Sequence, residues 1–219
     1  MNDTIAKTIA TTTHGRYLIA PPAASDAAPM LMGFHGYGEG AEAEMERLRA
    51  IPSAGDWLVV SVQGLHRFYQ RRTNDVIASW MTRQDRELAI ADNLAYVGSI
   101  VEKLLRERPF PHVVFAGFSQ GVAMAFRAAA ASTCRVAGVI AAGGDVPPEI
   151  GAAGLAKVGS ALLCRGVRDE WYTAATFAED QRRLREANVA VHPLEFDGGH
   201  EWTADVIAAA DDFLRGVRA

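Results

Sequence analysis

Gly117-Phe118-Ser119-Gln120-Gly121 joins an apolar run at residues 112–116 to an alanine-rich segment that begins at Val122. A strand that turns sharply into a helix needs glycines where any side chain would collide, and it holds the serine at its tip in a strained backbone conformation. The helix that follows leaves free N–H groups at its first turn. The pattern therefore predicts a strand–turn–helix unit that presents the Ser119 hydroxyl beside backbone donors.

Apolar runs of strand length alternate with helical patterns along nearly the whole chain. Strands are predicted at residues 17–20, 30–34, 57–62, 113–116, 136–141, 160–164 and 189–196, and helices at 41–50, 85–106, 120–131, 173–187 and 203–217. Several strand runs are apolar throughout, as expected for parallel strands that are covered on both faces. We therefore expect an α/β fold, with a mainly parallel central sheet flanked by helices on both faces, in a single domain over residues 1–219 with little or no cap.

Two connecting segments have weaker patterns. Residues 21–29 are rich in Pro and Ala and are expected to form a hairpin-type loop between the first two strands. Residues 63–83 show little periodicity and contain several aromatic residues. This segment is expected to be a long loop over the face that carries Ser119, where functional residues often lie.

The composition excludes several classes of protein. A net charge of −4, without a basic cluster that contains aromatic residues, argues against a nucleic-acid partner. Residues 1–13 lack the basic and apolar regions of a secretory signal, and no apolar run reaches the length of a membrane span. Cys134 and Cys164 have no metal-ligand spacing, so we expect free thiols, no metal site and a cytoplasmic location.

A serine hydroxyl is a weak nucleophile at neutral pH, so Ser119 needs a base, and the base needs an orienting acid. In this architecture both follow the serine along the chain, the acid first, each beyond the end of a later strand. His200 follows Asp197-Gly198-Gly199 directly after the last strand and is predicted to be the base. His192 lies inside that strand pattern and is expected to pack or to face solvent.

The acid has four candidates. Asp169 follows the strand at residues 160–164 and is favoured, and Asp145, which follows the preceding strand, is the alternative. Glu170 is expected to point away from the site, and Asp197 is too close in sequence to His200 to orient it. An Asp at a strand end is otherwise often a turn former or a helix cap.

Two backbone N–H groups are expected to stabilise the oxygen of a tetrahedral intermediate. One belongs to Gln120, the residue after the nucleophile. The other is expected from the loop Phe34-His35-Gly36-Tyr37-Gly38, where the N–H of Tyr37 is favoured. We expect His35 to hold this loop through a structural hydrogen bond rather than to transfer a proton.

These motifs resemble those of the α/β-hydrolase superfamily, particularly its phospholipase/carboxylesterase branch, which includes acyl-protein thioesterases. The resemblance covers about residues 30–202 and rests on five features: Phe34-His35-Gly36-Tyr37-Gly38, Ser79-Trp80, Gly117-Phe118-Ser119-Gln120-Gly121, the Asp169 loop and Gly198-Gly199-His200-Glu201. It implies serine-dependent cleavage of carboxylic esters or thioesters through an acyl-enzyme, with no metal ion and no organic cofactor.

Three departures from the branch bear on the substrate. Val122 stands where a further glycine is frequent, and Trp171-Tyr172 follow the acid where smaller aliphatic residues are usual. The aromatic loop Arg67-Phe68-Tyr69 is unexpected for a thioesterase that acts on lipid-modified proteins. We therefore expect esters of small to medium acyl groups. The candidates for lining the acyl pocket are Trp80, Met81, Trp171 and Tyr172, with a plain core role as the alternative for each.

Other functions would use the same residues. A peptidase or a dienelactone-type hydrolase shares this triad, although a serine instead of a cysteine at position 119 argues against the latter. A non-catalytic binding protein on the same fold would be expected to have lost triad or loop residues, and these are all present. The expected partner is a small-molecule ester, and the oligomeric state stays open, a homodimer included.

Overall fold

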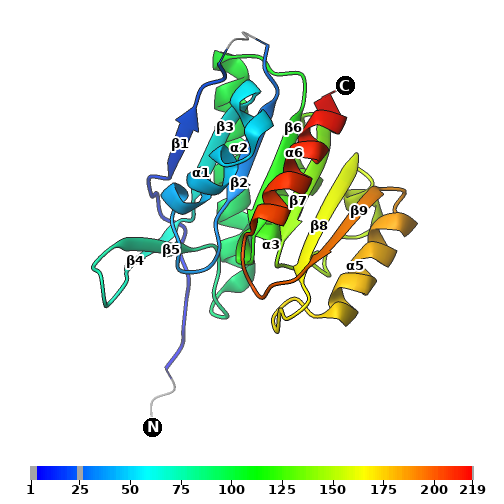
Figure 1. The fold of residues 1–219 in the computed structure, drawn as a ribbon. Coiled ribbons are helices and arrows are strands. Elements are labelled where there is room, and N and C mark those ends of the chain that lie inside the picture. The colour runs from blue at the N-terminus through cyan, green and yellow to red at the C-terminus, as the bar shows by residue number, and fades with distance from the viewer. Residues whose placement is uncertain (1–3, 24–26, 219) are drawn as a thin grey trace.

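A seven-stranded sheet lies between two layers of helices in the computed structural model, which describes residues 4–23 and 27–218 (Figure 1). The strands are β1 (Arg16–Ala20), β2 (Met30–Phe34), β3 (Leu58–Gln63), β6 (Val113–Phe118), β7 (Val136–Ala142), β8 (Ser160–Gly166) and β9 (Ala190–Phe196). Their order in the sheet is β1-β3-β2-β6-β7-β8-β9. Only β1 pairs antiparallel with its neighbour in this sheet, so the predicted mainly parallel α/β fold is confirmed.

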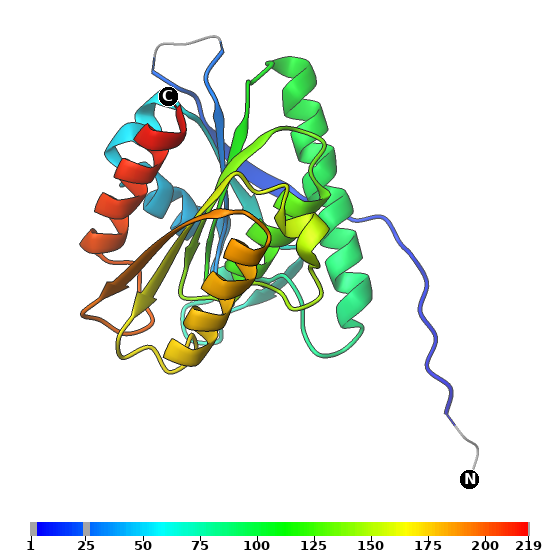
Figure 2. The same cartoon turned by 90° about the vertical axis from the view of Figure 1, so that its right-hand side faces the viewer.

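The helices cover both faces of the sheet. They are α1 (Ala41–Arg49), α2 (Arg86–Glu107), α3 (Gln120–Ala131), α4 (Ala152–Leu155), α5 (Ala174–Glu186) and α6 (Ala204–Arg218). Helices α1 and α6 lie on one face, and α2, α3 and α5 lie on the other (Figure 2). Alternate residues of the inner strands enter opposite apolar layers: Leu31 and Val114 pack on the α1/α6 side, and Met32 and Phe115 on the α2/α3 side.

The prediction of a hairpin between the first two strands is wrong. Strand β1 pairs antiparallel with β3, in a register that places Arg16 opposite Gln63, and β2 lies between β3 and β6. The different burial of β1 and β2 explains their positions in the sheet. Every residue of β2 is buried, as an inner strand requires, whereas β1 is half-exposed and lies at the edge.

Residues 63–83 are not one irregular loop. They contain strands β4 (His66–Tyr69) and β5 (Val76–Ser79), which pair antiparallel and project from the main body (Figure 1). Each strand has only four residues, which is too short for a clear alternating pattern. The other predicted strands and helices are present with small shifts at their ends; two short helices, α4 and a 3-10 turn at Pro52–Asp56, were not predicted.

Within the described ranges, no helix is both long and apolar enough to cross a lipid bilayer. Both cysteines are free, with Cys164 buried in β8 and Cys134 half-buried. Burial raises the pKa of both thiols, which keeps them protonated and unreactive at neutral pH.

Candidate active site

Ser119 lies between the end of β6 and the start of α3, with a positive φ of 53°. This conformation is strained for a residue with a side chain. The flanking glycines are required by the close approach of backbone: a Cβ on Gly117 would lie 2.4 Å from the Gly121 oxygen. A Cβ on Gly121 would lie 1.9 Å from the oxygen of Phe34. The turn therefore has the geometry that the sequence predicts for it.

A chain of two hydrogen bonds links the three predicted triad residues. Ser119 Oγ lies 2.8 Å from Nε2 of His200, and Nδ1 of the same ring lies 2.9 Å from Oδ2 of Asp169. His200 follows β9 and Asp169 follows β8, so parallel strands bring both to the edge of the sheet that carries Ser119. The imidazole also needs Gly143 (φ 66°), where a Cβ would lie 3.1 Å from His200 Cε1.

The Asp169 carboxylate is buried and is held by backbone donors. Its Oδ1 accepts hydrogen bonds from the N–H groups of Trp171 at 2.9 Å and Tyr172 at 3.0 Å, which leaves Oδ2 to the histidine. The buried guanidinium of Arg165 in turn donates to the Tyr172 oxygen at 2.9 Å and pairs with Glu195. Arg165 also donates to the Val167 oxygen at 3.2 Å, so the same guanidinium binds the loop on both sides of Asp169.

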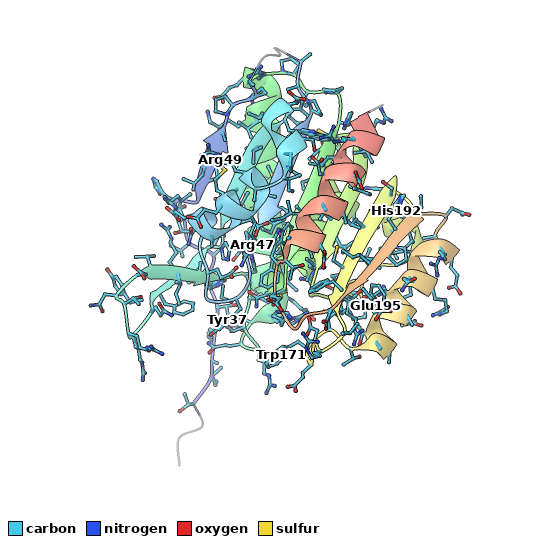
Figure 3. The ribbon with its side chains drawn as sticks, viewed as in Figure 1. Tyr37, Arg47, Arg49, Trp171, His192 and Glu195 are labelled. Atoms are coloured by element: carbon cyan, nitrogen blue, oxygen red, sulfur yellow. The ribbon has the colours of Figure 1, made fainter. Side chains whose placement is uncertain are left out.

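The other candidate residues lie outside this hydrogen-bonded chain. Asp145 is exposed beside the cleft, and Asp197 forms an exposed ion pair with Arg168. Glu170 is exposed next to Asp169. His192 is exposed on β9 (Figure 3), with its ring 5.6 Å from that of Phe213.

Two backbone N–H groups are available near Ser119. Gln120 is the first residue of α3, so its N–H has no acceptor within the helix. The loop after β2 contributes Tyr37, whose N–H makes no hydrogen bond with any described residue. Two contacts stabilise this loop: the N–H of Gly36 donates to Glu39 at 2.8 Å, and Glu39 pairs with Arg47.

His35 uses both ring nitrogens in structural hydrogen bonds. Its Nδ1 lies 2.7 Å from the Gly36 oxygen, and its Nε2 accepts from the N–H of Gly64 at 3.0 Å. The ring is buried, and desolvation lowers its pKa, so the neutral form is present at neutral pH. This arrangement ties the β2 loop to the segment after β3.

A cleft of about 500 Å³ opens beside Ser119. It is lined by Tyr37, Met81, Arg86, Ser119, Gln120, Ala123, Arg127, Gly143, Gly144, Asp145, Pro147, Pro148, Trp171 and His200. Tyr37 and Trp171 both lie in the lower half of the view in Figure 3 and are largely exposed.

Two of the four residues expected in the pocket lie in the core instead. Trp80 is fully buried, with its ring 5.0 Å from that of His35. Tyr172 is also buried, and its hydroxyl donates to Asp180 at 3.1 Å. Met81 and Trp171 do line the cleft, Met81 as an almost fully buried side chain.

Sequence reasoning missed two charged residues of the cleft. Arg127 lies two turns after Ser119 on α3, and Arg86 is the first residue of α2. The signal for Arg127 was present, since Gln120, Ala123 and Arg127 are spaced to share one helix face. Arg86 gives no such signal, because its place depends on how α2 packs beside α3.

Comparisons with known proteins agree with this architecture. The model of the phospholipase/carboxylesterase family matches residues 19–217. No curated protein matches by sequence. Among solved structures, acyl-protein thioesterase 2 of Zea mays has a TM-score of 0.73 at 15% identity, covering 94% of this chain and all (100%) of that one.

Two bacterial structures share the fold at similar identity. A carboxylesterase of Bacillus cereus has a TM-score of 0.71 at 18% identity and covers 93% of this chain and 94% of its own. A phospholipase/carboxylesterase of Dyadobacter fermentans has a TM-score of 0.70 at 20% identity and covers 93% of this chain and 98% of its own. The family match spans nearly the whole chain, which therefore belongs to the phospholipase/carboxylesterase family of α/β-hydrolases and is a hydrolase.

Proposed function

We propose that this chain cleaves carboxylic esters of small to medium acyl groups through an acyl-enzyme on Ser119. The observation that carries the proposal is the pair of hydrogen bonds from Ser119 Oγ to His200 Nε2 and from His200 Nδ1 to Asp169 Oδ2, 2.8 and 2.9 Å long. They join a nucleophile, a base and an orienting acid at the wall of an open cleft.

Acylation begins when His200 Nε2 takes the proton of the Ser119 hydroxyl while Oγ attacks the ester carbonyl carbon. The negative charge that develops on the carbonyl oxygen is stabilised by the N–H groups of Gln120 and Tyr37. Asp169 holds the ring with Nδ1 protonated and stabilises the imidazolium that forms. The intermediate then collapses, the imidazolium gives its proton to the departing alkoxide, and an alcohol leaves.

Deacylation repeats these steps with water as the nucleophile. His200 takes a proton from a water molecule as its oxygen attacks the acyl carbon, and the same two N–H groups stabilise the oxygen. Collapse breaks the bond to Ser119 Oγ, which recovers its proton from the imidazolium. The products are a carboxylic acid and the free enzyme.

Thioesters are the second candidate substrate class, because a thiolate leaves from the same tetrahedral intermediate. The structural neighbour from Zea mays is described as an acyl-protein thioesterase, and the one from Bacillus cereus as a carboxylesterase. The volume of the cleft, about 500 Å³, suits small and medium acyl groups. Matched p-nitrophenyl esters and acyl thioesters of two to twelve carbons would rank the two classes by kcat/KM.

Replacing the nucleophile is the direct test. Ser119→Ala should abolish turnover of p-nitrophenyl butyrate, and a fluorophosphonate probe should label wild type, but not the variant, at the peptide that contains Ser119. Ser132→Ala is the matched control, since this half-buried serine follows α3 at its other end. Undiminished turnover by Ser119→Ala, with both variants folded, would refute the proposal.

A further inference from the structure

Two guanidinium groups from different helices meet at one side chain of the cleft. Nη1 of Arg86 donates to the sulfur of Met81 at 3.1 Å, and Nη1 of Arg127 lies 3.6 Å from the same sulfur. All three residues line the cleft that contains Ser119. A thioether sulfur is a weak hydrogen-bond acceptor and carries no charge, so both cationic donors lack a strong acceptor at this point.

The remaining contacts differ between the two arginines. Arg127 is almost fully buried, and its Nε and Nη2 both donate to Glu149, which leaves Nη1 toward Met81. Arg86 is exposed and makes no ion pair with any described residue. Glu149 therefore forms its ion pair with Arg127 and also interacts electrostatically with Arg86, so that one carboxylate faces two guanidinium groups.

The distribution of charge along the cleft is uneven. Among the described residues, Asp145 is the one carboxylate that lines the cleft, and it directly follows Gly143 and Gly144, which pack against His200 and Ser119. Asp145 forms no ion pair with a described residue, and it lies at the Ser119 end of the cleft.

Both arginines line the cleft at some distance from Ser119, and the length of α3 gives that distance for Arg127. Arg127 follows Ser119 by eight residues, which corresponds to about 12 Å along the helix axis. Between them, Ala123 contributes only a methyl group to the wall. Because long side chains on a helix point toward its N-terminus, the guanidinium of Arg127 extends back toward the serine. An extended chain bound to Ser119 Oγ can therefore reach both guanidinium groups.

We infer that Arg86 and Arg127 form an anion subsite, and that the preferred substrates are esters that carry a carboxylate several bonds from the scissile carbonyl. The carboxylate would take the place of the Met81 sulfur as acceptor for both Nη1 groups, with its apolar chain against Ala123 and the two prolines, Pro147 and Pro148. Arginine suits this role because its planar fork matches the geometry of a carboxylate. This inference rests on the proposed ester hydrolysis and specifies its substrate.

Pairs of esters that differ only in charge test the subsite. Mono-p-nitrophenyl adipate, suberate and sebacate would be compared with their methyl esters, which remove the charge and keep the chain. Butyrate esters of 6-hydroxyhexanoate and of its methyl ester place the carboxylate on the alcohol side instead. Wild type should prefer the charged member of at least one pair by about tenfold in kcat/KM. In Arg86→Gln the ratio of kcat/KM for the charged ester to that for its neutral partner should fall to below about twofold.

A matched variant separates a specific contact from a general change of charge. Arg83→Gln alters an exposed arginine that borders a neighbouring groove rather than the cleft, so the preference should persist. Equal kcat/KM for charged and neutral esters in every pair, or an equal loss for both in Arg86→Gln, would overturn the inference.

A binding measurement makes the test independent of turnover. Calorimetry of monomethyl adipate with Ser119→Ala should give a Kd about tenfold lower than with the Ser119→Ala/Arg86→Gln double variant. If no ester is hydrolysed but this difference is found, the proposed function fails and the subsite stands. Equal affinities would overturn the subsite whatever the enzyme hydrolyses.

Discussion

Arg47 lies over the ring of Phe118, with its guanidinium carbon 4.3 Å from the ring centroid. Phe118 directly precedes Ser119, and the same ring lies 5.1 Å from the ring of His200. Arg47 also pairs with Glu39, which accepts the N–H of Gly36 in the loop that carries the Tyr37 donor. One side chain of α1 thus connects the nucleophile turn with the loop expected to supply an oxyanion donor.

The Glu39 carboxylate should matter for catalysis through this loop. Glu39→Ala removes the acceptor of the Gly36 N–H, which should let the Tyr37 N–H move and lower kcat by roughly tenfold, since loss of one oxyanion donor costs about 10²–10³ in rate. Glu39→Gln keeps an acceptor oxygen for Gly36 and should restore most of the activity. The measurements are kcat and KM on p-nitrophenyl butyrate.

The control for this prediction is thermal unfolding of both variants. Equal kcat values for Glu39→Ala and Glu39→Gln would contradict a positioning role, because only the Gln variant can still bind Gly36. A loss that appears in the unfolding midpoint and not in kcat would indicate that Glu39 stabilises the fold alone.

The orienting acid can be assigned by comparing two substitutions. Asp169→Asn removes the charge beside Nδ1 of His200 and can favour the wrong ring tautomer, so kcat should fall by about 10⁴. Asp145→Asn should leave kcat on a neutral ester within about threefold, since no hydrogen bond joins Asp145 to His200 in the described structure. A larger loss in Asp145→Asn would assign the acid to the loop after β7.

Replacement of Gly121 by alanine should destabilise the protein far more than the same replacement of a glycine in another helix. A Cβ at Gly121 would lie 1.9 Å from the backbone oxygen of Phe34, so Gly121→Ala must shift β2 or α3 and should cost roughly 3 kcal/mol of unfolding free energy. Gly216→Ala is the control, because at this exposed site in α6 a Cβ would meet no described atom within 4 Å apart from the backbone of its own helix and its chain neighbours. It should stabilise the protein by up to about 1 kcal/mol. Urea unfolding of both variants measures the difference.

Most of the fold and of the candidate site could be predicted from short sequence motifs and from their order along the chain. Gly117 and Gly121 belong to a short recurrent turn motif, although Gly121 is needed because of the distant Phe34 oxygen, and the chain order of Ser119, Asp169 and His200 follows from a parallel sheet. Both features could therefore be predicted from the sequence. The pairing of β1 with β3 was not readable, because residues 16 and 63 become neighbours only when β2 is placed inside the sheet.

The positions of three site residues could not be predicted for the same reason, since they too depend on contacts between distant parts of the chain. Trp80 follows β5, and its backbone N–H donates to the Gln120 side chain, 40 residues away in the chain, while its ring N–H donates to the His35 oxygen. Arg86 and Arg127 meet at Met81 only because α2 packs against α3. Contacts between distant elements leave no local pattern in the sequence.

Glu44 is fully buried on α1, and desolvation raises its pKa to about 8 despite an ion pair with Arg47 at 3.2 Å. Its Oε1 has no hydrogen-bond partner among the described residues. An acid with a raised pKa in the folded state keeps its proton while the unfolded chain has already lost it. The unfolding free energy must therefore fall as the pH rises from the pKa of the unfolded state toward 8.

This effect can be followed between about pH 6.8 and pH 8. Burial raises the pKa of Asp180 only to about 6, and it lowers the pKa of His35 and of His112, so the two imidazoles contribute a rise and not a fall of the unfolding free energy as the pH increases. Across this window the wild-type unfolding free energy should fall by about 1 kcal/mol through Glu44, and Glu44→Gln should lack that fall. Glu46→Gln, at an exposed position of the same helix, should keep the wild-type dependence. Urea unfolding at both pH values tests this, and parallel pH dependences for wild type and Glu44→Gln would show that Glu44 does not titrate there.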